Sequence, residues 1–99
     1  MNVTGIVVID LTRLRLQGRD AASTARGAIW RALADAPVSV DVRLVVPAWD
    51  WWAPAAASAL LDHEDDINTV VVESDAATVR QWVLALRYGV GAAEPLMRR

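Results

Sequence analysis

Three carboxylate side chains follow stretches that are rich in β-branched residues. Asp10 ends the run Ile6–Ile9, and Glu73 and Asp75 follow Val70–Val72. If both runs are parallel strands, their carboxyl ends meet at one edge of the sheet, where α/β proteins place their ligands. Three carboxylates at that edge could bind Mg²⁺, which prefers oxygen ligands. A site that acts on phosphoryl groups would also need a cation such as Lys to stabilise them, and the chain contains no Lys. We therefore favour the simpler interpretation that these carboxylates cap turns and helices.

Other catalytic arrangements are not indicated. His63 is the only histidine, there is no cysteine, and no G-x-S-x-G elbow is present to hold a nucleophilic serine. No glycine-rich phosphate loop follows any expected strand, since Gly18 stands alone after the first one. We therefore expect no enzymatic activity, no cofactor and no metal ion.

Charge and length limit the partners. The formal net charge is −2, with ten Arg and no Lys. The arginines form no basic stripe of the kind that neutralises phosphates, so nucleic-acid binding is disfavoured. No apolar run approaches the roughly 20 residues that a bilayer span needs. The first residues also lack the basic region of a signal peptide, so we expect a cytoplasmic protein that does not bind membranes.

The hydrophobic pattern predicts three strands alternating with three helices. We expect strands over 5–11, 38–46 and 67–73, and helices over 21–34 and 54–61. A last helix is expected between a cap at Ser74 or Asp75 and a terminating glycine, Gly89. Its apolar stripe, expected to face the sheet, is formed by Val79, Trp82, Val83, Leu86 and Val90.

This order of elements predicts a two- or three-layer α/β fold with a small parallel sheet and right-handed crossovers. The first strand is uninterruptedly apolar and is placed at the centre, whereas the second alternates with charged residues like an edge strand. The expected strand order is therefore 2-1-3. Residues 1–90 should form one domain, followed by a flexible tail over 91–99.

Three tryptophans stand close together in the loop after the second strand: Trp49, Trp51 and Trp52. Each can bury roughly 150–250 Å², which is too much for all three to enter a core of this size. Some could pack across the helix ends. At least one is expected to stay exposed and contact a partner, because Trp is enriched at binding hot spots.

From Val7 onward the chain resembles a STAS domain, the fold of bacterial anti-sigma-factor antagonists. Val7–Thr12 is similar to the family's strand ending in Asp-Leu-Ser/Thr, and the small-residue helix after Ala21 is similar to the helix that follows. Val42–Val46 and Ile67–Ala77 resemble its next strand and its last strand and helix start. The resemblance implies a STAS-like fold and a role in protein binding.

Two features separate this chain from the family pattern. The family's first strands have no counterpart before Gly5, so the resemblance is to a domain truncated at its N-terminus. Gly18–Ala21 also stands where the family has its phosphorylatable Ser. Asp20 could mimic a permanently charged form of that residue, or only cap the helix.

The function expected from the sequence is a non-enzymatic regulatory module that binds a protein partner or itself, most simply as a homodimer. The expected contact residues are Trp49, Trp51, Trp52 and Asp20. The alternative is a small ligand- or Mg²⁺-binding α/β domain that uses the carboxylates at the carboxyl edge of the sheet.

Overall fold

The computed structural model describes residues 5–36 and 39–89, which form an α/β fold with three strands and three helices. The elements alternate along the chain: β1 (Ile6–Asp10), α1 (Ala21–Ala34), β2 (Val40–Val45), α2 (Ala53–Asp62), β3 (Ile67–Glu73) and α3 (Ala76–Tyr88). Two short 3₁₀ turns, η1 (Leu11–Arg13) and η2 (Glu64–Asp66), follow β1 and α2. The tail expected over 91–99 lies outside the described residues.

The sheet is parallel, with the order β1-β2-β3. The expected order 2-1-3 is therefore wrong: the alternating strand β2 is central, and the apolar strand β1 lies at an edge. The strand β2 carries charged residues because one face of the sheet is bare, and not because the strand lies at the edge of the sheet. In β1, the β-branched run makes a strand because of its propensity, although Ile6 and Val8 remain exposed.

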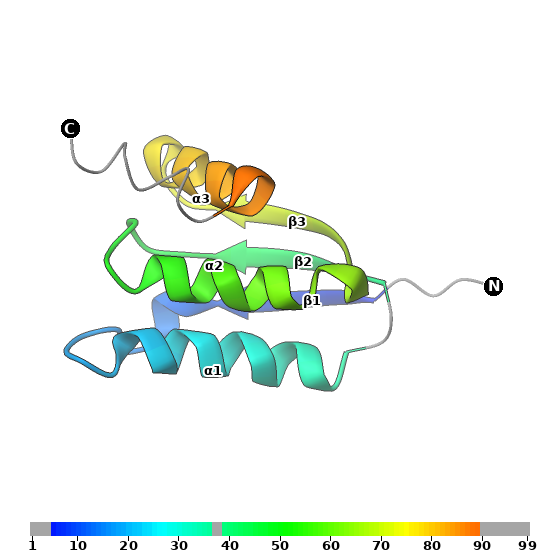
Figure 1. Ribbon diagram of the computed structural model, residues 1–99, viewed down its shortest axis with the longest axis horizontal. Coiled ribbons are helices and arrows are strands. Elements are labelled where there is room, and N and C mark those ends of the chain that lie inside the picture. The colour runs from blue at the N-terminus through cyan, green and yellow to red at the C-terminus, as the bar shows by residue number, and fades with distance from the viewer. Residues whose placement is uncertain (1–4, 37–38, 90–99) are drawn as a thin grey trace.

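The helices cover one face of this sheet, which gives two layers. Figure 1 shows α2 in front of the strands, with α1 alongside α2 and α3 next to β3. Small residues such as Ala25 on α1, and Ala56 and Ala57 on α2, are fully buried, so the helices can pack closely. The core between the layers also contains the larger side chains Ile9, Leu11, Ile29, Leu33, Val40, Val42, Leu44, Trp52, Leu60 and Trp82.

Local signals account for most helix ends. The Asp75 carboxylate accepts hydrogen bonds from the Thr78 backbone N–H (2.8 Å) and hydroxyl (2.9 Å), so Asp75 caps α3 as expected. Pro54 lies in the first turn of α2, where its missing N–H costs nothing. Gly89 ends α3 with a φ of 100°, a conformation that favours glycine.

Helix α3 is rotated relative to the expected stripe. Trp82 and Ala85 are fully buried, whereas the side chain of Val83 is 39% exposed. Val83 and Leu86 lie against the outer side of β3, where the sheet ends and no further strand covers them in the described part of the chain. Val90, the last member of the stripe, falls outside the described residues. Among the helices that are described, none is long and apolar enough to cross a membrane.

Candidate functional site: the uncovered face of the sheet

The three candidate carboxylates do not converge. Asp10 and Glu73 end the two edge strands, with β2 between them. Asp75 is already occupied as the cap of α3. In residues 5–36 and 39–89, no three His, Cys, Asp or Glu side chains gather in a way that could hold a metal ion.

Asp10 acts locally, in the turn that follows β1. Its carboxylate accepts hydrogen bonds from the Thr12 backbone N–H (3.0 Å) and from the Thr12 hydroxyl. Arg13 lies 3.7 Å from the same carboxylate. The Thr12 hydroxyl, the Thr12 N–H and the nearby Arg13 charge hold the pKa of Asp10 below its ordinary value. An anionic side chain bound in this way stabilises the turn.

His63 also has a structural environment. Its Nδ1 lies 2.9 Å from the Ala59 carbonyl oxygen, within the last turn of α2. The imidazole packs edge to face against Trp30 of α1, with ring centroids 4.6 Å apart. The ring therefore links the ends of two helices, and no Ser or Cys is hydrogen-bonded to it among the described residues.

The tryptophan loop after β2 is divided between core and surface. Trp52 and Trp49 are buried, and Trp49 packs edge to face against Trp82 of α3 at 5.4 Å. Trp51 is 54% exposed, which meets the expectation that at least one of the three stays accessible. Trp49 and Trp52 are thus part of the core and offer little surface for the partner contact that the sequence predicted for them.

Asp20 precedes α1 and is exposed. Its side chain makes no capping hydrogen bond in the described structure, in contrast to the expected cap. Its backbone carbonyl instead accepts from the Thr24 N–H (2.9 Å) and the Ser23 hydroxyl (3.2 Å). The Asp20 carboxylate is therefore free to face solvent at the carboxyl end of the sheet.

The largest unusual feature is the face of the sheet that the three helices leave bare. Strand side chains alternate between faces, and the register aligns them in three rows across the strands. The rows on the bare face are Ile6–Asp41–Thr69, Val8–Arg43–Val71 and Asp10–Val45–Glu73. Ile6, Val8 and Val71 are 73%, 55% and 57% exposed, so nothing in the described structure covers them.

Polar groups on this face are largely paired with one another. Arg43, at the centre, donates from Nη2 to a Glu73 carboxylate oxygen (2.9 Å) and from Nε to the other oxygen. Asp41 accepts from the Thr69 hydroxyl (2.7 Å) and from the Asn68 side-chain amide (3.0 Å). These two hydrogen bonds lower the pKa of Asp41, so this carboxylate is anionic. In the described structure no Arg forms an ion pair with it, since Arg43 pairs with Glu73.

A β-bulge places Asn68 beside Asp41. The pairing of β2 with β3 shifts between Val40 and Asp41, so that Ile67 pairs with Val40 and Thr69 pairs with Asp41. The extra residue in β3 lets Ile67 pack against the core while both Asn68 and Thr69 bond Asp41 on the bare face. Strict alternation along β3 would have placed Asn68 on the core side.

The sequence contained a signal for this surface in the alternation of Val40, Val42 and Leu44 with Asp41 and Arg43. That pattern indicates a strand with one uncovered face. The alternation in β1 was hidden because its exposed residues are aliphatic. A comparison of the chain with protein-family models, curated proteins and solved structures finds no match.

Proposed function

We propose that this chain is a non-enzymatic protein-binding module whose bare sheet face is covered by an amphipathic helix of another protein. One observation carries the proposal: one whole face of a parallel sheet is uncovered in the described structure, and the aliphatic side chains of Ile6, Val8 and Val71 are exposed on it. Parallel sheets are normally covered on both faces, in most cases by helices. The protein-binding role implied by the STAS resemblance is in line with this proposal.

The size of the face favours a foreign partner over a second copy. Three strands of five to seven residues make a surface about 14 Å wide and about 18 Å long, or about 250 Å² in plan. Stable interfaces bury about 800 Å² per partner. Two flat faces stacked on each other would fall well short of that area, whereas a partner can also contact the rims. A helix of about 12 residues matches the 18 Å length.

The chemistry of the face defines the partner's side chains. Val8 and Val71 flank the centre and call for aliphatic residues above them. Arg43 and Glu73 already neutralise each other, which reduces the cost of removing them from water. Asp41 remains as an anion, so the partner's helix should carry an Arg or Lys above it. Trp51 and Asp20 are further exposed contact candidates at the carboxyl end of the sheet.

The alternative function, a ligand or Mg²⁺ site built from carboxylates, has less support. Glu73 is engaged by Arg43, and Asp75 by Thr78. Asp10 lies across β2 from Glu73 and is bonded to Thr12. Each carboxylate thus serves a local structural purpose, so we infer no catalytic reaction for this edge of the sheet.

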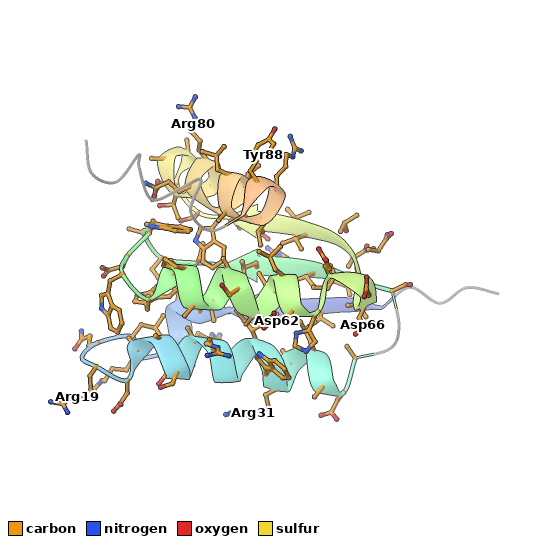
Figure 2. All side chains as sticks on the ribbon, viewed as in Figure 1. Arg19, Arg31, Asp62, Asp66, Arg80 and Tyr88 are labelled. Atoms are coloured by element: carbon orange, nitrogen blue, oxygen red, sulfur yellow. The ribbon has the colours of Figure 1, made fainter. Side chains whose placement is uncertain are left out.

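Site-specific photo-crosslinking in the cells of origin tests the proposed function. A photoreactive amino acid replaces Val71 on the bare face or, as the control, Arg80, which Figure 2 shows pointing away from α3. We expect a defined adduct from position 71 that is absent from position 80, attached to a helix with aliphatic and basic residues. The purified partner should bind Val71→Glu at least tenfold more weakly than the wild type, and Arg80→Glu equally well.

Two results would overturn the proposal. An adduct with a second copy of the chain would show that the face is a homodimer contact. Equal, diffuse labelling from positions 71 and 80 would show that the face stays bare in the cell.

A further inference from the structure

A groove runs beneath α3 along β3, from the end of α2 to the outer side of β3. It consists of two hollows of about 180 Å³ and 300 Å³, which share Val70 and Leu86 in their linings. Val72 and Val83 line the larger hollow, and Leu60 contributes to the smaller one. The larger hollow is aliphatic apart from Arg87, whereas Glu64, Asn68 and Thr69 also line the smaller one. The larger hollow lies where the side chains of a fourth strand would enter the core.

Among the described residues, no strand pairs with the backbone of β3 at its outer edge. The Glu73 carbonyl accepts a hydrogen bond from the Val46 N–H (3.1 Å), so the backbone groups of Glu73 point toward β2. Successive residues of a strand direct their N–H and C=O groups to opposite sides. Val70 and Val72 consequently present theirs to the outer edge, and the side chains of these same two residues line the groove.

This edge lacks the usual protection against pairing. Native edge strands carry charged residues or proline that prevent another strand from joining. From Ile67 to Val72 the strand has neither, and its first charged residue is Glu73 at the very end. The only irregularity of β3, the bulge at Asn68, lies at its amino end.

We propose that β3 accepts a fourth strand from another protein, an extended segment with aliphatic side chains at alternate positions. Its main chain would hydrogen-bond to Val70 and Val72, and its aliphatic side chains would fill the groove against Val83 and Leu86. The intervening side chains would extend the bare face next to Glu73, where uncharged or basic residues fit. This is strand addition at an exposed sheet edge, and it does not depend on the proposed helix contact.

The other occupants fit less well. A second copy would join by pairing its own β3 with this one. Each copy carries α3 on the face of the sheet that the helices cover, so the α3 of the second copy would lie over the groove that the strand is meant to fill. The chain's residues after Gly89 include Gly91 and Pro95. Both weaken a strand, and proline cannot donate to the ladder.

A phage-displayed library of nine-residue peptides tests this proposal. The matched variants are Val72→Pro, which removes an outward N–H of β3, and Val8→Pro, which does the same at the outer edge of β1. Val8 is the correct control because the Gly5 carbonyl accepts from the Asp41 N–H (2.9 Å), so alternation turns the backbone of Val8 away from β2. Proline is tolerated at such outward positions of edge strands.

We expect selection on the wild type to enrich peptides with aliphatic residues at alternate positions. Their dissociation constants should rise at least tenfold on Val72→Pro and stay unchanged on Val8→Pro. If Val72→Pro does not fold, Val83→Arg serves instead. Val83 is exposed and lines the groove, so an arginine side chain at this position fills the groove without entering the core. Amide hydrogen exchange should slow at Val70 and Val72 upon peptide binding.

Three outcomes would overturn the proposal. The library could yield no alternating aliphatic peptides, or the enriched peptides could bind Val72→Pro as tightly as the wild type. The amides of Val70 and Val72 could also be protected in the free chain. Concentration-dependent protection would then identify a second copy as the occupant, and concentration-independent protection would identify the chain's own residues.

Discussion

Replacing Trp82 by alanine should bring the domain close to unfolding. Trp82 is fully buried on α3 and packs edge to face against Trp49, with ring centroids 5.4 Å apart. A buried Trp removes roughly 150–250 Å² from water, which at about 25 cal/mol/Å² corresponds to about 4–6 kcal/mol. Measured Trp-to-Ala changes in cores cost about 3–5 kcal/mol. Domains of this size have only about 5–15 kcal/mol of stability in total.

The neighbouring residue provides the matched control. Val83 is 39% exposed, so Val83→Ala should change the free energy of unfolding by less than about 1 kcal/mol. Both values come from urea titrations followed by circular dichroism, which does not depend on the removed indole. A loss at Val83→Ala equal to that at Trp82→Ala would refute the assigned orientation of α3.

Trp82→Phe separates packing from hydrogen bonding. The indole N–H groups of Trp82 and Trp49 are buried and make no hydrogen bond within the described structure. A buried donor without a partner costs about 1–3 kcal/mol, and phenylalanine removes it while keeping a ring against Trp49. Trp82→Phe should therefore cost less than half as much as Trp82→Ala in the same titration.

Two further predictions concern the ends of α3. Asp75→Ala should lower the free energy of unfolding by about 0.5–2 kcal/mol, because the cap of Thr78 is lost. The hydrogen bonds from Thr78 hold the pKa of Asp75 below its ordinary 3.8 in the folded state. The stability that Asp75 contributes is thus present above pH 3.8 and is lost as the pH falls through the lower folded-state pKa. Urea midpoints measured from pH 7 to pH 3 should therefore fall less steeply in Asp75→Ala than in the wild type; parallel curves would contradict this reason. Gly89→Ala should cost about 1 kcal/mol, because φ is 100° while nothing lies within 4 Å of the added methyl group. An unchanged melting temperature in calorimetry would show that α3 does not need this conformation to end.

Several elements were predictable from short stretches of sequence. The bounds of α1 (Ala21–Ala34) and β3 (Ile67–Glu73) agree with the expectation. The cap was narrowed to Ser74 or Asp75, of which the structure has Asp75, and the end at Gly89 was identified correctly. These features depend on interactions between residues a few positions apart, which the sequence displays directly.

The position of each strand in the sheet was a different matter. Alternation in β2 and the apolar run in β1 both record how strongly each face of a strand is covered. Neither pattern records which strands lie alongside, so β1 was placed at the centre and β2 at an edge. A bare sheet face produces the same alternation in a central strand as in an edge strand.

The sequence by itself determined the α/β alternation, the type of each element and the residues that end the last helix, since local propensity and capping are sufficient for these. Only the tertiary structure decided the order β1-β2-β3, and with it the separation of Asp10 from Glu73 and the ion pair between Arg43 and Glu73. It also decided that Trp49 and Trp52 enter the core while Trp51 does not. Such choices depend on packing between segments far apart in the chain, where the removal of apolar surface from water is settled by the whole arrangement and not by any one stretch.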